Sequence, residues 1–559
     1  MISNPIIRKE VLSALRTKKA YLIQGLFLLV TVALVLLLWP EEGLQDIGGQ
    51  QARRILSILS LGELMLIILF APAFTAAALT SEAEHNTLES LFFTALKPSE
   101  IVFGKIVGAL AFLIILVLSG LPALAMTFPL GGVSAMDILA ATSILLLSAI
   151  YLGMIGFLVS TLAHRSYRAI IITYAVLLVV CFVAAAPAWP VSRNILKYQG
   201  EIGQAVLHVI ASLSPLEAML SLVWPDSAYA QGSANMPPFW ALFVPMSLAL
   251  TCVMAGYCRY RLRRPPAPPK HRAKAHLIDR GVSARSFFFI IDPRRRKRPI
   301  SWWQNPVLVK EFRTRPMLQG QWLMRVVGLC LIASVGLMFL VSISVSAFVA
   351  ESAGMISNMA TSVAAMMVVL VVMTGPAISA GTICADRETG VWDLMRATPL
   401  PSWRIVSGKF QASIIPLALL ALATLPALLI LLFFNMELWP NILRVCYVIG
   451  MTIMFVATAG TFFSSFFSRT STATAWTYAL VVSLSMLTLL VLLAEDLFSR
   501  RFIEAVFLVN PVVAAMDAAG SGAVQKYASL NSHLKIMGLA TATMFVVSVA
   551  RVFQLRRAS

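Results

Sequence analysis

The side chains that could support acid–base, nucleophilic or metal chemistry are scattered along this 559-residue chain. Its six histidines fall in predicted loops and a central linker, without the spacing of metal ligands or of a nucleophile and its base. Its six cysteines include no Cys-x-x-Cys pair, so they predict neither a zinc site nor a disulfide framework. We therefore expect no catalytic residue, metal or cofactor in this chain. The histidines are His85, His164, His208, His271, His276 and His533.

A Gly-Lys pair, which is part of the phosphate loop of nucleotide-binding proteins, occurs at Gly104-Lys105 and again at Gly408-Lys409. Both pairs lack the upstream glycine at the required distance, and neither lysine is followed by the hydroxyl residue that binds magnesium. Each pair also opens a hydrophobic run. We expect no nucleotide site here.

The two Gly-Lys pairs end a segment that occurs twice. Residues 72–105 reappear as residues 376–409, and 376 − 72 = 304. Tyr174 and Tyr478 keep the same offset, since 478 − 174 = 304. The chain is therefore predicted to be a duplicated unit.

Within the repeated segment, the spacing predicts a short helix over about 87–96 and about 391–398. Asn86 and Gly390 are acceptable N-cap residues, and an acid follows three positions later in each copy. A helix of this length cannot cross a bilayer, so we expect its apolar face to be covered by lipid headgroups or by another protein. The two acids are Glu89 and Asp393, and the prolines that stop the helices are Pro98 and Pro399.

The elements around this segment are predicted to be membrane spans. A mean hydropathy of +0.84, with 59% apolar and 12% charged residues, is typical of a polytopic membrane protein. With roughly 20 apolar residues per span, each half holds about six spans, so both halves enter the membrane the same way round as parallel repeats. We thus expect an all-α fold with about 12 transmembrane helices. The predicted spans are 20–39, 57–79, 103–127, 138–160, 168–187, 238–257, 322–346, 358–380, 405–434, 440–464, 473–493 and 533–552.

The strongest break in composition is residues 258–301, between a first half at 1–257 and a second half at 302–559. It contains a proline-rich stretch at 265–269 and five consecutive cations at 294–298. Much of the net charge of +19 lies around this linker. Without interleaved aromatic residues, the basic run favours anionic lipid over nucleic acid. By the positive-inside rule, both termini and the linker are cytoplasmic.

Each half opens on the same pattern, Asn-Pro followed by a Lys-Glu pair, which predicts a capped amphipathic helix. The pattern favours a helix in the membrane interface, and an ordinary cytoplasmic helix is the alternative. The residues of the two patterns are Asn4, Pro5, Lys9, Glu10, Asn305, Pro306, Lys310 and Glu311.

Glu63 is the one carboxylate clearly inside an apolar run, and its repeat counterpart is Met367. A substrate-pathway role and snorkelling to the external interface are both conceivable, and its predicted place near the external end favours snorkelling. The external segments 188–237 and 494–532 are the least regular stretches outside the linker, and we expect an outer gate, a docking surface for an extracytoplasmic partner, or plain loops.

The segments from Glu82 to Lys105 and from Asp386 to Lys409 resemble the cytoplasmic loop of type-2 ABC exporter permeases. The Asn-Pro openings, the six-span halves, and the motifs Leu213-Ser214-Pro215 and Val509-Asn510-Pro511 resemble that superfamily as well. The resemblance implies a prokaryotic cytoplasmic (inner) membrane protein that exports a substrate.

In that family the short loop helix is the coupling helix, which docks on a separate ATP-binding subunit. The resemblance implies that two ATPase copies, carrying ATP and magnesium, bind one copy of this chain. It also implies that a set of residues contacts or positions these ATPases: Glu82, Glu84, Thr87, Leu88, Glu89, Leu91, Asp386, Glu388, Val391, Trp392, Asp393 and Met395.

Two other classes stay open. A secondary transporter with two six-span halves fits the topology, although it would be expected to carry ion-coupling charges within its spans. A membrane scaffold without transport activity is the other alternative. The spans do not select among lipid, polysaccharide, peptide, drug or ion as the substrate.

Overall fold

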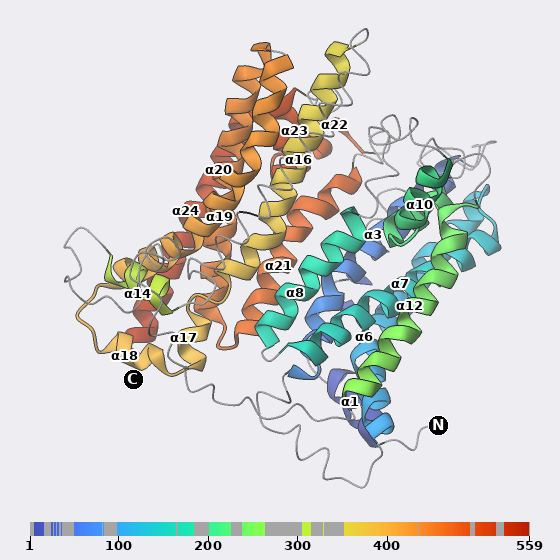
Figure 1. Cartoon of the computed structure of the whole chain (residues 1–559), viewed down its shortest axis with the longest axis horizontal. Coiled ribbons are helices and arrows are strands. Elements are labelled where there is room, and N and C mark those ends of the chain that lie inside the picture. Colours follow the sequence, from blue (N-terminus) through green and yellow to red (C-terminus); the bar gives the residue numbers. More distant parts are fainter. Residues whose placement is uncertain are drawn as a thin grey trace. The chain divides into compact units, whose positions relative to one another are not determined.

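The computed structural model describes most of the chain as helices (Figure 1). The chain divides into two compact units, which are described separately. The first unit is residues 1–266 with 489–499, and the second is residues 267–488 with 500–559. The described residues are 5–15, single positions between 24 and 35, 50–80, 82, 98–163, 166–183, 201–224, 237–262, 305–314, 328, 352–434, 436–491, 498–520 and 530–557.

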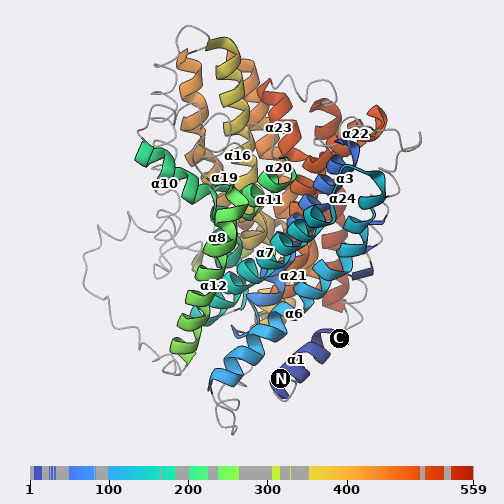
Figure 2. The ribbon, with the colours of Figure 1, turned by 90° about the vertical axis from the view of Figure 1, so that its right-hand side faces the viewer.

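In the first unit the long helix α7 is central, because α3, α6 and α12 all pack against it. The short helix α1 lies beside α6, and α11 packs against both α3 and α7 (Figure 2). The elements are α1 (Pro5–Leu15), α3 (Gln50–Thr75), α6 (Pro98–Ala125), η1 (Phe128–Leu130), α7 (Ala135–Leu162), α8 (Ser166–Leu178), η2 (Val179–Val183), α10 (Glu201–Ala211), α11 (Pro215–Val223) and α12 (Phe239–Leu262).

In the second unit α20 has the corresponding role, with α16, α19 and α24 packed against it. The short helix α14 lies against α19, and α23 packs against α16 and α20. The elements are α14 (Pro306–Thr314), α16 (Ser352–Ser379), α17 (Cys384–Glu388), α18 (Val391–Arg396), α19 (Ser402–Phe434), η5 (Met436–Leu438), α20 (Trp439–Phe466), α21 (Thr470–Met486), α22 (Arg500–Phe507), α23 (Pro511–Ala519) and α24 (Leu530–Arg557).

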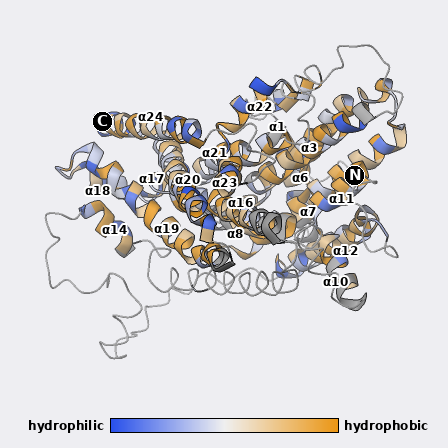
Figure 3. Ribbon diagram, turned by 90° about the horizontal axis from the view of Figure 1, so that it is seen from above, coloured by the Kyte–Doolittle hydropathy of each residue, from blue (hydrophilic) through white to orange (hydrophobic). Residues whose placement is uncertain are grey.

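The long helices are largely hydrophobic along their length (Figure 3), and nine in the described part of the chain could cross a membrane. They coincide with nine of the predicted spans, and the chain is an all-α polytopic membrane protein. The predicted fifth span falls partly on α8 and η2, where the apolar helix is shorter. The predicted first and seventh spans, 20–39 and 322–346, lie mostly outside the described residues.

One tyrosine contact occurs in both units at the offset of 304. The hydroxyl of Tyr174 on α8 donates to the carbonyl of Leu69 on α3, at 2.7 Å. The hydroxyl of Tyr478 on α21 donates to the carbonyl of Met373 on α16, also at 2.7 Å. A buried phenol needs a hydrogen-bond partner, so Tyr174 fixes α8 against α3 and Tyr478 fixes α21 against α16.

A serine on the central helix also forms the same contacts in both units. Ser160 on α7 accepts hydrogen bonds from the backbone N–H groups of Leu79 and Thr80, at 3.0 and 3.2 Å. Ser464 on α20 accepts from the N–H groups of the two residues 304 positions later, Ile383 and Cys384, at 2.8 and 2.9 Å. The residues that follow α3 and α16 are therefore each held by one serine of the central helix.

The two segments predicted to be the least regular outside the linker contain short helices in their described parts. Each contains two short helices, α10 and α11 in the first unit and α22 and α23 in the second. The pair α22 and α23 is bent by 97°, as in a broken span or a re-entrant loop. Asn510 caps the start of α23. Its side chain accepts hydrogen bonds from the N–H groups of Val512 and Val513, at 2.7 and 3.2 Å, and Pro511 is the first residue of the helix.

Glu63 does not lie near the end of its helix, so the snorkelling interpretation is wrong. Helix α3 begins at Gln50, seven residues before the predicted span, and Glu63 is only 2% exposed. The prediction placed the arginines at positions 53 and 54 in a loop, but both belong to the helix. Helix α12 likewise runs to Leu262, past the predicted start of the linker at 258.

Candidate functional site

The opening helix of each half lies against the start of the helix that carries the Gly-Lys pair. The predicted Asn-Pro start is present in α14, where the Asn305 side chain accepts from the N–H of Val307 at 3.0 Å. The amide of Asn305 also donates to the carbonyl of Arg404 at 2.7 Å. Gly408 allows this close approach, because a Cβ there would lie 2.8 Å from the Cβ of Val307.

In the first unit, three residues from three elements form what we call the first lysine cluster: Glu10 of α1, Glu82 after α3, and Lys105 of α6. The Nζ of Lys105 lies 2.6 Å from an oxygen of Glu10 and 2.7 Å from an oxygen of Glu82. The lysine side chain is only 4% exposed. A buried ammonium group is strongly unfavourable without such partners, so the cluster holds these three elements together.

The second lysine cluster consists of Lys310 and Glu311 of α14, Asp386 of α17 and Lys409 of α19. Lys409 is fully buried, and its Nζ bonds to Asp386, to Glu311 at 3.0 Å, and to the carbonyl of Thr382 at 2.5 Å. Lys310 lies 2.9 Å from both carboxylate oxygens of Asp386. Two ammonium groups thus face two carboxylates.

The clusters give the Gly-Lys pairs a structural role. Lys105 and Lys409 were absent from the predicted site residues, although both stand 23 positions after an acid of the repeated segment. That shared spacing was the signal available in the sequence. Glu82 and Asp386 bond to these lysines, so each acid attaches the start of its loop to the helix that carries the Gly-Lys pair.

Glu388 fixes the same loop to another helix of the second unit. Its carboxylate accepts from the N–H and from the hydroxyl of Thr470, at 2.7 and 2.6 Å. Thr470 is the first residue of α21, where N–H groups have no helical partner and a negative charge is favourable. Glu388 therefore acts as a cap for α21, supplied from α17.

The predicted short helix is present as α18, which begins after Gly390. Gly390 has a φ of 71°, a left-handed conformation that glycine adopts readily, and no side chain caps the helix. Asp393 lies in the first turn, as predicted. Ala397 follows the helix end at Arg396, two residues before Pro399.

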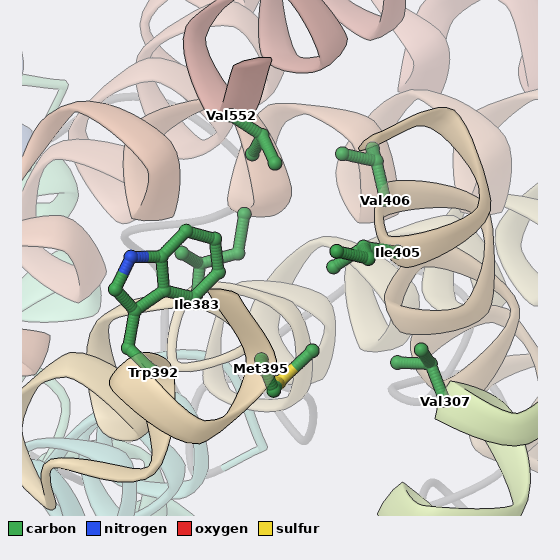
Figure 4. Packing of buried hydrophobic residues seen from close by; sticks show 7 residues of the cluster. All are labelled: Val307, Ile383, Trp392, Met395, Ile405, Val406 and Val552. Atoms are coloured by element: carbon green, nitrogen blue, oxygen red, sulfur yellow. The ribbon is translucent and has the colours of Figure 1, made fainter. Parts of the chain in front are cut away.

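The apolar face of α18 is not covered by lipid or by a partner, so that expectation is wrong for this copy. Trp392 and Met395 are 6% and 8% exposed and pack into a core of their own unit (Figure 4). Their neighbours come from α14, α19 and α24 and from the segment before α17. The cluster consists of Val307, Ile383, Trp392, Met395, Ile405, Val406 and Val552.

The opposite face of α18 is exposed. Leu394 is 72% exposed and Asp393 is exposed beside it, whereas Val391 is half-buried. Two hydrogen bonds from Arg556 of α24 to the carbonyls of Thr398 and Leu400 hold the chain after α18. A rigid short helix thus presents an exposed leucine, a residue that the sequence prediction missed because Leu394 lies off the predicted apolar stripe.

Several predicted site residues lie outside the described residues, so the structure neither brings them together nor separates them. Among the opening-helix residues that are described, Pro5 and Lys9 are exposed and Pro306 is half-buried. The predicted residues outside the described part are Asn4, Glu84, Thr87, Leu88, Glu89 and Leu91.

Among the described residues no group of three metal-binding side chains comes together. Residues 4–264 match the model of a family described as ABC-2 family transporter protein. No curated protein matches the chain.

Proposed function

With an ABC-2 transporter domain over residues 4–264 as the premise, we propose that this chain is the membrane-spanning permease of an ATP-driven exporter. ATP hydrolysis takes place on a separate ATPase subunit, which carries the ATP and magnesium. Two ATPase copies dock on one chain, one on the repeated loop of each half. Both termini and both loops face the cytoplasm, in the cytoplasmic membrane of a prokaryote.

The observation that carries this proposal is the family match, and the recurring contacts support its extension to the second half. The tyrosine and serine contacts of the two units lie at one offset of 304. In both units a buried lysine joins the opening helix, the loop and the third helix. A force applied to the loop by a partner is then passed directly to a membrane helix.

The exposed face of α18 is the docking surface that we propose for the second ATPase. Leu394 and Asp393 contact the partner, and Trp392 and Met395 position them from the core side. Exposed apolar residues beside a polar rim are typical of protein interfaces. Asp386 and Glu388 have positioning roles, because both carboxylates bond within the chain.

Copurification tests the proposal. The chain is co-expressed with the ATPase encoded by an adjacent reading frame, one that carries a phosphate loop, and isolated through a tag on the chain. We expect Leu394→Arg to weaken ATPase retention at least about tenfold, because it buries an unpaired cation at the interface. Met436→Arg is the matched control, since Met436 is 79% exposed beyond the opposite end of α19 and its change should leave retention unaltered.

Equal retention of the ATPase by wild type and Leu394→Arg would overturn the docking surface. Failure of any such ATPase to copurify, together with ion-driven transport in vesicles, would favour the secondary transporter instead. ATP hydrolysis by the complex measures the coupling directly. Replacing Glu84 and Glu388 together by glutamine should abolish the stimulation of the ATPase by this chain while the spans stay folded.

A further inference from the structure

Glu63 lies in the middle of the candidate membrane span Ala52–Pro72, and no described residue is its hydrogen-bond partner. It follows the first residue of α3 by 13 positions, or about 20 Å at 1.5 Å per residue. Its side chain is 2% exposed, and neither carboxylate oxygen has a hydrogen-bond partner in the described part of the chain. The nearby hydroxyls of Ser57 and Ser60 bond to carbonyls of α3 itself.

The carboxylate lies against the backbone of α6 at Gly120. A Cβ at this position would overlap the carboxylate, and the three atoms nearest to it all belong to Glu63. Pro122, two residues further along α6, has no N–H, so the carbonyl of Leu118 lacks its helical donor. Gly120 thus makes room for an acid between apolar helices, and the same helix has a carbonyl without its helical donor.

The second half shows that packing alone does not need this acid. At the offset of 304, Met367 replaces Glu63 and Thr424 replaces Gly120. Met367 is also 2% exposed, and the Thr424 hydroxyl bonds to the carbonyl of Ala421 at 2.9 Å. Pro426 keeps the proline of the first half. The same position is thus filled by an apolar side chain, while an ionisable residue within a membrane span costs about 2.5 to 3.5 kcal/mol on permissive scales.

Charged and titratable groups also occur on α3 and on the helices packed against it. None of those whose side chains the structure describes forms a hydrogen bond with the Glu63 carboxylate. An ionised carboxylate in an apolar interior requires a compensating positive charge. The groups on these elements are Arg53 and Arg54 of α3, Glu100 and Lys105 of α6, Asp137 and Tyr151 of α7, Tyr167, Arg168 and Tyr174 of α8, and Glu217 of α11.

We propose that Glu63 and Gly120 form a binding site for a small positive charge, a proton or a monovalent cation, within the membrane-spanning part of the first half. The site exists in one half only, so the permease binds one such charge per chain. The proposal does not depend on how the ATPase docks, because it concerns α3 and α6 alone.

Infrared spectroscopy of the purified full chain in lipid bilayers tests this site. If the ligand is a proton, wild type shows the C=O stretch of a protonated carboxyl in apolar surroundings, and the band shifts when H₂O is exchanged for D₂O. We expect Glu63→Gln to remove that band. Glu217→Gln is the matched control, since Glu217 is the other buried acid among the described residues of the first half and its replacement should leave the Glu63 band in place.

If the ligand is a cation, the carboxylate stretch of Glu63 shifts when sodium, potassium or ammonium is titrated at constant pH, and Glu63→Gln removes that response. Exchanging the residues of this site between the halves separates loss of the site from a folding defect. The pair Glu63→Met with Gly120→Thr copies the second half and should fold without the signal. The pair Met367→Glu with Thr424→Gly should create a second signal.

The proposal is overturned if Glu63→Gln leaves both spectral regions unchanged over all pH values and cations. It is also overturned if Glu63 shows a carboxylate stretch that responds to neither pH nor cations, because the ionised carboxylate would then be held by a fixed internal partner. Either result leaves the ATPase-docking proposal untouched, since copurification reads that separately.

Discussion

The two lysine clusters join the same three elements, but they differ in burial and in charge balance. In the first cluster one lysine faces two carboxylates, and the Glu10 side chain is 27% exposed. In the second cluster two lysines face two carboxylates, and the Lys409 and Glu311 side chains are 0% and 2% exposed. A buried ion pair is stable only with such partners, and Glu311 is shielded from solvent more completely than Glu10 is.

The difference in burial between the two clusters indicates how much each one contributes to the stability of its half. Lys409 and Glu311 of the second cluster are shielded from solvent, so their charges interact strongly and the loss of either one is costly. Water reaches the carboxylates of the first cluster and reduces the cost of an unpaired charge. The same sequence pattern can therefore have different energetic importance in its two copies, and substitutions can measure the difference.

Lys409→Met should have the largest effect. It removes a fully buried cation and leaves Glu311 and Asp386 without it, which lowers the free energy of unfolding by about 3 to 5 kcal/mol. The midpoint of thermal unfolding in detergent measures this. Adding Asp386→Leu should recover part of the loss, because an apolar pair replaces an unbalanced charge. A double variant less stable than Lys409→Met would contradict the account.

Lys105→Met should have a smaller effect, about 1 to 3 kcal/mol, because Glu10 and Glu82 keep contact with water. The same unfolding experiment measures it beside Lys409→Met. Equal losses in the two variants would show that burial does not separate the clusters.

Thr470→Val should cost about 1 to 2 kcal/mol, since it removes the hydroxyl that bonds to Glu388. The double-mutant cycle of Thr470→Val with Glu388→Gln isolates this contact, and we expect a coupling energy of about 1 kcal/mol. Additive effects of the two changes would mean that Glu388 does not cap α21. The stability of the first half should not change.

The comparison of Lys310→Met with Lys9→Met should give the smallest effects. Lys310 bonds to both oxygens of Asp386, so its loss should cost about 1 kcal/mol or less. Its counterpart Lys9 is exposed, and Lys9→Met should leave the unfolding midpoint unchanged. A larger loss from Lys9→Met would reverse the assigned order of the clusters.

The sequence was sufficient for nine membrane helices and for the short helix α18, because span length and helix-start spacing are local and directly countable. It could not show that Trp392 and Met395 face inward. A six-residue amphipathic helix has an apolar side whatever covers it, and here the cover comes from α14 and α24, far away in the chain. The depth of Glu63 was misjudged because the predicted span began after Arg53 and Arg54. Both arginines belong to α3, and Arg53 donates a hydrogen bond to the carbonyl of Gly132.

The serine contacts of Ser160 and Ser464 have a mechanical consequence. A hydroxyl that holds two successive N–H groups works as a two-point joint, which resists swivelling more than a single bond does. The chain leaving α3 or α16 is therefore clamped in direction to α7 or α20. A tilt of the central helix is therefore passed to residues 79–80 or 383–384, and the lysine clusters then hold the acids that follow, Glu82 and Asp386.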